Sequence, residues 1–474
     1  MSDIEGWETV IGLEVHCELA TQTKLFCGCP NLFGDEPNTN VCPVCLGLPG
    51  SLPVLNANAV ELAVRLGQAL HCTVERSVFA RKNYFYPDMP KDFQISQYDL
   101  PTNVNGYLDL PNSKRIGIER AHIEEDTGKN THVGGDGRIH GAEYSLIDYN
   151  RAGIPLVEIV SRPDLRSADD AKDYVNELRA ILVATGVSDA KMEEGSMRVD
   201  ANVSVRHVGD ELGTRCEIKN LNTVRSLVHA IDHEVVRQVE LITGGERVRQ
   251  ETRHWDEAAG LTRPGRSKEQ AEDYRYFPEP DLVPLDPDAD YVARIAAAMP
   301  LMPSDRRVRL ATASNGAQGA VAIAVSRGLD ELAIAAIEAG GDPGRVLTHI
   351  EHNLAVDGAA DLAPASLAAL TLMEAEGALT ATQAKVVLAE LVESGGEPEA
   401  IAKAKGFEAM DASALDASVE AAIAAEPDVW AKYVAGDDKA VGRLVGSVMK
   451  ATHGQADGKA VTAKLQERRA AASG

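Results

Sequence analysis

The sequence predicts an α+β protein with a mainly antiparallel sheet in its first part, followed by an all-helical region and a small helical tail. Before about residue 285, short β-rich runs alternate with turn residues, and no regular strand–helix–strand alternation appears. After Pro303, apolar residues recur almost throughout at helical spacing. Aromatic residues make up only 4% of the chain and lie mostly before residue 300, whereas alanine dominates beyond it.

The individual elements follow from these patterns. Runs of β-forming residues predict strands at 9–11, 115–118, 155–160 and 201–205. Apolar spacing predicts helices in the first part at 57–69, 169–185 and 227–241. Ser167 is a suitable N-cap for the second of these helices. In the second part, helices are predicted at 317–327, 329–339, 343–356, 367–376, 382–393, 399–405, 414–425, 439–451 and 459–469.

The chain is too long for one compact core, so we expect more than one domain. Residues 256–287 are polar and rich in Gly and Pro, which predicts a long loop followed by a linker. The change in composition past the middle adds a boundary. The sequence therefore predicts a mixed first domain at 1–296, a helical domain at 297–405 and a helical tail domain at 406–474.

Charge and hydropathy limit the class of protein. The net charge of -25 argues against a general nucleic-acid binder, although it leaves room for a local basic patch. The segment after Val429 is such a patch on an acidic protein. The N-terminus lacks the features of a secretory signal, and the most apolar stretch, 319–340, carries four charged residues. We therefore expect a cytoplasmic protein that does not enter a membrane.

Four of the seven cysteines lie close together in the sequence. Cys27 and Cys29 form one pair, and Cys42 and Cys45 follow after twelve residues. A pair of thiolates on each of two turns is a common way to build a closed tetrahedral zinc site, and a closed site is structural. The other reading, four buried or redox-active cysteines, stays open.

Acidic and imidazole side chains recur in short motifs at 12–16 (GLEVH), 122–129 (HIEEDTGK), 198–202 (RVDAN) and 217–220 (EIKN). In a strand, residues i and i+2 share a face, so Glu14 would lie beside His16, and Glu217 beside Lys219. Adjacent carboxylates such as Glu124 and Glu125 repel each other unless a cation lies nearby. Oxygen ligands of this kind suit Mg²⁺. The alternative is that each acid is a solvated surface charge.

Basic residues accompany these motifs, among them Lys82, Arg151 and Lys219. Such residues can neutralise phosphates in a phosphoryl-transfer site. The sequence contains neither a Walker A motif nor a GxGxxG after a predicted strand. If ATP binds, its site is therefore not one of the common nucleotide folds.

Several longer motifs resemble one family. They stand in order at 8–16 (ETVIGLEVH), 81–88 (RKNYFYPD), 94–99 (QISQYD), 151–161 (RAGIPLVEIVS), 192–198 (MEEGSMR) and 273–281 (DYRYFPEPD). The chain resembles the B subunits of the heterotrimeric tRNA-dependent amidotransferases over essentially its whole length. The resemblance implies a cradle-shaped catalytic domain bearing a zinc knuckle, then a helical domain and a YqeY-like tail that holds tRNA.

The resemblance also implies a chemistry. A B subunit uses ATP and Mg²⁺ to phosphorylate the side-chain carboxylate of Glu-tRNA(Gln) or Asp-tRNA(Asn). Ammonia released from glutamine by the amidase A subunit then displaces phosphate, and a small C subunit braces the other two. Such an enzyme is a glutamine-hydrolysing carbon–nitrogen ligase.

By the same resemblance, the metal and reaction centre comprises Glu14, His16, Glu124, Glu125, Asp200 and Glu217. Of these, Glu14, His16 and Glu125 are expected to be catalytic. Lys82, Tyr84 and Lys219 are expected on the substrate or phosphate side, and Lys82, Arg151 and Lys219 as nucleotide contacts. Some members of the family lack the four cysteines, which supports a structural role for zinc at Cys27, Cys29, Cys42 and Cys45.

Two positions depart from the family pattern. Arg443 stands where we expect an aromatic residue, and 348–352 (THIEH) stands where we expect a helix bearing a tryptophan. Two other functions remain open. The chain could be a zinc-bearing tRNA-binding scaffold of the same complex without chemistry of its own. It could also be the archaeal-type paralogue, although that protein carries an inserted domain for which the chain has no room.

Overall fold

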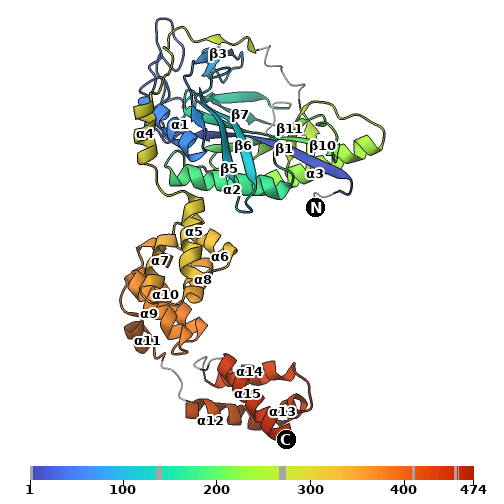
Figure 1. Ribbon diagram of the computed structural model, residues 1–474, viewed down its shortest axis with the longest axis vertical. Coiled ribbons are helices and arrows are strands. Elements are labelled where there is room, and N and C mark those ends of the chain that lie inside the picture. Colours follow the sequence, from blue (N-terminus) through green and yellow to red (C-terminus); the bar gives the residue numbers. More distant parts are fainter. Residues whose placement is uncertain are drawn as a thin grey trace. The chain divides into compact units, whose positions relative to one another are not determined.

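The computed structural model describes residues 4–134, 141–265, 274–407, 412–452, 456 and 458–473. It divides into two compact units, Met1–Met302 and Pro303–Gly474 (Figure 1). The first unit holds the sheets and the second is helical. The expected α+β class, with an antiparallel sheet before a helical region, is confirmed.

The first unit is built on a nine-stranded sheet in the order β13-β12-β11-β10-β1-β9-β6-β5-β2. Its neighbouring strands pair antiparallel, except β11 and β12, which pair parallel. The strands are β1 (Trp7–Glu18), β2 (Thr73–Val74), β5 (Asn103–Asp109), β6 (Arg115–Glu125), β9 (Pro155–Ser161), β10 (Met197–His207), β11 (Cys216–Leu221), β12 (Thr252–Asp256) and β13 (Leu261–Pro264).

Apolar and polar residues alternate along β1 and give the sheet one apolar and one polar face. Leu13, Val15 and Cys17 are buried in the core, whereas Glu14 and His16 between them are partly exposed. The core also takes in apolar residues of α1 (Ala57–Ala69), α2 (Ala168–Ala184) and α3 (Val224–Thr243). In Figure 1, α2 lies below the large sheet and β3 above it. The opposite face of the sheet is thereby left to polar side chains.

The helices of the first unit begin where the sequence supplies caps. Ser167 accepts a hydrogen bond from the Asp170 amide at 3.0 Å, as predicted for α2. Thr223 caps α3 in the same way through the Ser226 amide, also at 3.0 Å. The helix α1 spans the residues that apolar spacing predicted.

Two smaller sheets complete the first unit. One has the order β14-β3-β4, made of β14 (Phe277–Pro278), β3 (Ala80–Asn83) and β4 (Phe93–Ser96). The other is the hairpin of β7 (Lys129–Val133) and β8 (Tyr144–Asp148). The prediction of a loop and linker at 256–287 was partly wrong, because β13 and β14 both lie there. Residues 266–273 of that stretch lie outside the described part of the chain.

The second unit contains helices with two separate apolar cores, one formed within residues 310–402 and one within 419–465. Helices α5 (Pro303–Ser314) and α13 (Pro427–Val434) were not predicted, nor was α4 (Ala289–Ala297) of the first unit. The division into three domains at residues 296 and 405 stays a prediction. The other helices are α6 (Gln318–Ser326), α7 (Asp330–Glu338), α8 (Pro343–His352), α9 (Pro364–Ala375), α10 (Ala381–Ser394), α11 (Pro398–Ala404), α12 (Ala412–Ala425), α14 (Ala440–Ala451) and α15 (Gly458–Ser473).

Among the residues that the structure describes, none of the helices combines the length and the apolar character needed to cross a bilayer.

Candidate active site and zinc site

The polar face of the large sheet gathers ionisable side chains from four strands. Strand β9 lies between β1 and β6, so Glu158 stands opposite His16 on one side and opposite His122 on the other. On the far side of β1, Asp200 of β10 stands opposite Glu14. Antiparallel pairing in register therefore places Glu158 beside His16 and Asp200 beside Glu14, although each pair is far apart in the chain.

At the centre of this face lies a group of three potential metal ligands. One ligand atom from each of His16, Glu124 and Glu158 falls within 4.8 Å of the other two. The Nε2 atom of His16 is 3.4 Å from Glu158 Oε2 and 3.8 Å from Glu124 Oε1. His122 lies behind them, with Nε2 3.6 Å from Glu158 and 3.8 Å from Glu124. We call His16, Glu124 and Glu158 the ligand triad.

The charges in the triad compensate one another. Burial disfavours the charged imidazole of His16, but the hydrogen bond to Glu158 and the negative charges of Glu158 and Glu124 outweigh it and raise the pKa to about 9. Burial would raise the pKa of Glu158, yet the charges of His122 and His16 hold it well below its usual range. A divalent cation could take over this compensation once His16 loses its proton, and the two carboxylates supply the oxygen ligands that a hard cation takes.

A second polar group lies on β10 and β11. Lys219 Nζ donates to Asp200 at 2.5 Å and lies 3.3 Å from Glu217. Burial lowers the pKa of Lys219, but these two carboxylates together raise it above its usual value. Asn202 donates to Glu14 Oε1 at 3.0 Å. Within the described residues, Glu14, Asp200 and Glu217 stay outside the group that can jointly hold an ion.

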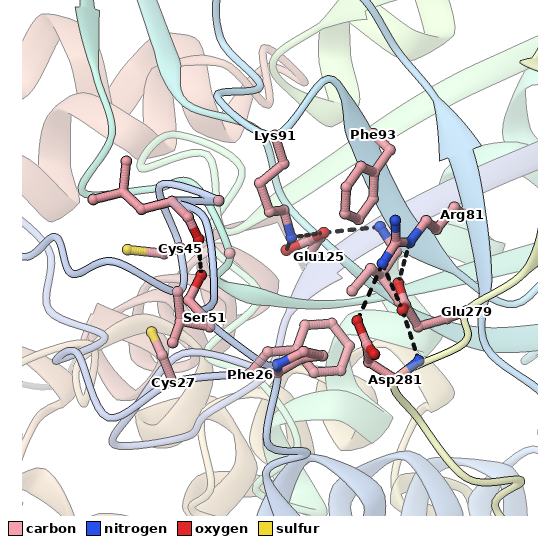
Figure 2. Close-up of a pocket in the computed structure, with 16 residues that line it drawn as sticks. Phe26, Cys27, Cys45, Ser51, Arg81, Lys91, Phe93, Glu125, Glu279 and Asp281 are labelled. Carbon is pink, nitrogen blue, oxygen red and sulfur yellow. Dashed lines mark hydrogen bonds and ion pairs between the residues drawn. The ribbon is translucent and has the colours of Figure 1, made fainter.

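Glu125 lies in a different environment from its neighbour Glu124. Its carboxylate accepts hydrogen bonds from Lys91 Nζ at 2.5 and 2.7 Å and from the Ile95 amide at 2.8 Å. These groups line a cavity of about 200 Å³, shown in Figure 2, which also contains Arg81 and Glu279. The sequence placed Glu125 at the metal, whereas the structure pairs it with Lys91 in this cavity.

The four clustered cysteines come together as predicted. Their Sγ atoms all lie within 4.8 Å of one another, which is the donor set of a closed zinc site. A hydrogen bond from Cys27, with help from the Cys42 amide and the charge of Lys24, lowers the pKa of Cys45 to about 5. Cys27 and Cys45 also line the cavity that holds Glu125 (Figure 2).

The remaining predicted residues lie around these groups. Lys82 Nζ lies 4.7 Å from the centre of the Tyr274 ring. Burial would raise the pKa of Glu124, but the hydrogen bond from His122 and the charges of His16 and Lys82 lower it. The Tyr84 ring lies 4.7 Å from that of Tyr86. Arg151 donates to the carbonyl groups of residues 127 and 128, at 3.0 Å each, and so holds the turn after β6.

Sequence reasoning did not name Glu158 as a site residue, and it noted His122 and Lys91 only within or near the acidic motifs, without placing them in the site. For Glu158 a signal exists, because it is the one charged residue in the apolar run of β9. A lone acid at a strand position between apolar neighbours points to the polar face of a sheet. Lys91 carries no comparable signal, since its partner Glu125 lies 34 residues away.

Comparison with protein families agrees with this geometry. A model of the GatB/GatE catalytic domain matches residues 9–293, and a model of the GatB domain matches residues 347–468. The first match covers more than half of the chain and includes both the ligand triad and the four cysteines. The first unit is therefore a catalytic domain of the GatB/GatE class.

Individual relatives narrow the family further. The chain is 50% identical over 98% of its length to the B subunit of the aspartyl/glutamyl-tRNA(Asn/Gln) amidotransferase of Frankia casuarinae, and covers 95% of that protein. It is 48% identical to the protein of the same name from Thermobifida fusca, with 96% and 92% of the two chains covered. It is 50% identical to the protein of the same name from Salinispora arenicola, with 98% of this chain and 97% of that protein covered. The chain belongs to the family of aspartyl/glutamyl-tRNA(Asn/Gln) amidotransferase B subunits.

Proposed function

We propose that this chain is the subunit at which the side-chain carboxylate of Glu-tRNA(Gln) or Asp-tRNA(Asn) is phosphorylated by ATP and converted to an amide. Family membership supports the amidotransferase activity, carried over from the names of the relatives. Ammonia would come from a glutaminase partner, the A subunit, and a small C subunit would complete a cytoplasmic heterotrimer.

The ligand triad is the observation that carries the proposal. Phosphorylating a carboxylate brings two anions together, so the site needs positive charge where they meet. The side chains of His16, Glu158 and Glu124 are 21%, 15% and 6% exposed, so a ligand can approach them from the polar face. When bound there, Mg²⁺ would supply the positive charge that screens the two anions.

The reaction would proceed in two balanced steps. An oxygen of the substrate carboxylate attacks the γ-phosphorus of ATP, and ADP leaves with the electrons of the broken P–O bond. Ammonia then attacks the acyl carbon of the acyl phosphate, and phosphate leaves with the C–O bond electrons and accepts a proton from nitrogen. His16, Glu124 and Glu158 would hold the cation, while Lys82 and Lys219 face phosphate oxygens.

Zinc at the four cysteines would have a structural role. All four positions of a tetrahedral site would be filled by thiolates, which leaves none for a substrate. The cysteine loops also form one wall of the cavity around Glu125 and Lys91. Zinc would therefore stabilise the shape of this cavity without taking part in the reaction.

The test uses the complex reconstituted with its partner subunits. We expect Glu158→Gln to lower ATP hydrolysis dependent on Glu-tRNA(Gln) by at least about 100-fold, because the triad loses a charged ligand. Glu119→Gln is the matched control, since Glu119 lies exposed on β6, the strand that carries Glu124. A Glu158→Gln complex with normal turnover would favour the alternative function, a zinc-bearing tRNA scaffold without chemistry of its own.

A further inference from the structure

The few aromatic residues of this chain concentrate around the small sheet β14-β3-β4. The whole sequence has 7 Phe, 11 Tyr and 3 Trp. Many of them lie within or beside this sheet: Tyr84, Phe85, Tyr86, Phe93, Tyr98, Tyr274, Tyr276 and Phe277. Phe93 packs against the core, but a core does not account for Phe85, Tyr98 and Phe277, which are 70%, 50% and 44% exposed. Exposed aromatic side chains indicate a binding surface where they lie together.

Three of these residues form an ordered surface that we call the aromatic platform: Tyr98, Tyr274 and Tyr276. The rings of Tyr98 and Tyr276 stack with their centres 4.2 Å apart and their planes 10° from parallel. The ring of Tyr274 meets that of Tyr276 edge to face at 6.2 Å. Lys82 Nζ lies 4.7 Å from the centre of the Tyr274 ring, so a cation accompanies the platform.

The backbone beneath the platform is held in place. Asn83 donates hydrogen bonds to the carbonyl groups of Tyr274 and Arg275, at 2.9 and 3.0 Å. Arg275 adopts a left-handed conformation with φ of 48°, which is costly for a residue with a side chain and places two tyrosines on either side of it. The surroundings therefore fix a conformation that the local sequence alone would not favour.

The platform lies beside the ligand triad. Ser96, two residues before Tyr98, donates to Glu124 Oε2 at 3.1 Å. Tyr276 is placed with this strand because its ring stacks on that of Tyr98, with the ring centres 4.2 Å apart. Strand β4 thus carries a contact to a metal ligand and leads directly into one ring of the platform.

We propose that the aromatic platform binds the unpaired 3′-terminal base of the aminoacyl-tRNA. This inference rests on the proposed function, because the reacting amino acid is esterified to that terminal nucleoside. The base must then lie close to the reaction centre, where the platform is. Proteins commonly recognise unpaired RNA bases by stacking them on aromatic side chains, with a cation close to the backbone.

The adenine of ATP could stack in the same way, so the experiment must separate the two. We would measure the Kd of the reconstituted complex for tRNA(Gln), intact or lacking its 3′-terminal nucleotide, and the KM for ATP. The variants are Tyr98→Ala, Tyr98→Phe and Tyr107→Ala. Tyr107 is the matched control, since its ring also stacks, on His71 at 4.3 Å. Tyr107 pairs with Gly117 of β6, which lies seven residues before Glu124 and therefore about 23 Å from it along the strand.

We expect Tyr98→Ala to weaken binding of intact tRNA about tenfold, the effect of losing one stacked base. Binding of the shortened tRNA and the KM for ATP should not change, and Tyr98→Phe should bind intact tRNA normally because it keeps the ring. Equal weakening for both tRNAs, or a higher KM for ATP alone, would overturn the proposal. The tRNA-binding measurements need no turnover, so they can fail while the amidotransferase activity of the wild-type complex stands.

Discussion

A buried carboxylate on α3 allows one prediction to be worked through in detail. The side chain of Glu234 is fully buried and accepts hydrogen bonds from Arg237 Nε at 2.9 Å, Gln238 at 2.8 Å and Thr262 at 3.0 Å. It therefore joins α3 to β13. Because α3 also packs on β10 and β11, Glu234 supports the strands that carry Asp200 and Lys219.

We expect Glu234→Gln to lower the free energy of unfolding by about 3 kcal/mol at pH 7. Removing one partner of a buried ion pair costs roughly 3–5 kcal/mol. The lower end applies here because Arg237 is 21% exposed and can regain water. The amide of Gln would also place N–H donors against the donors of Gln238 and Arg237, so the contact cannot be restored by rotation.

The loss should depend on pH in a definite direction. Burial would raise the pKa of Glu234, but the hydrogen bonds from Arg237 and Gln238 lower it below the ordinary value of 4.5. Its stabilisation is therefore complete above pH 4.5 and is lost as the pH falls through the lowered pKa. The difference between wild type and Glu234→Gln should shrink correspondingly in acid.

The assay is denaturant unfolding of the full chain followed by tryptophan fluorescence, since Trp255 lies buried on β12 of the same unit. Glu119→Gln, on an exposed position of β6, should change the free energy of unfolding by less than about 0.5 kcal/mol. A loss below about 1 kcal/mol for Glu234→Gln at pH 7, or one that stays constant into acid, would refute the reasoning.

Further outcomes follow from the two other polar sites. Cys42→Ser should reduce bound zinc, measured by elemental analysis, and lower the melting temperature, because one of four thiolates is lost; unchanged zinc content would contradict this. Glu125→Ala should lower stability by roughly 3 kcal/mol in denaturant unfolding, since it leaves Lys91, only 8% exposed, without its partner. The same variant should reduce tRNA-dependent ATP hydrolysis less than Glu158→Gln does; an equal loss would place Glu125 in the reaction itself.

The sequence predicted helices better than strands, for a physical reason. Apolar spacing fixed α1 completely, because that helix has one apolar face against the core. The predicted strand 9–11 is only part of β1, which runs to Glu18. Residues 12–18, which the prediction left out, alternate between the core and the polar face. Glu14 and His16 among them are not strong β-formers, so the strand pattern was not recognised there. The strands were thus underestimated at the positions that carry the site.

Part of the candidate site could be predicted from the sequence. The pairing of Glu14 with His16 and of Glu217 with Lys219 on shared faces needed only the two-residue period of a strand. The same rule could have separated Glu124 from Glu125, because adjacent residues of a strand point to opposite faces. What local pattern could not supply is the order of strands in the sheet. Glu158 meets His16 only because β9 lies between β1 and β6.

The position of β9 between two paired strands limits where insertions and deletions can be tolerated. Both neighbours pair with it in fixed register, so Glu158 faces His16 and His122 at once. Adding or deleting a single residue inside β9 would turn Val157 or Ile159 toward the two imidazoles and point the acid into the core. Insertions should therefore be tolerated in the connections at either end of this strand and eliminated by selection within it.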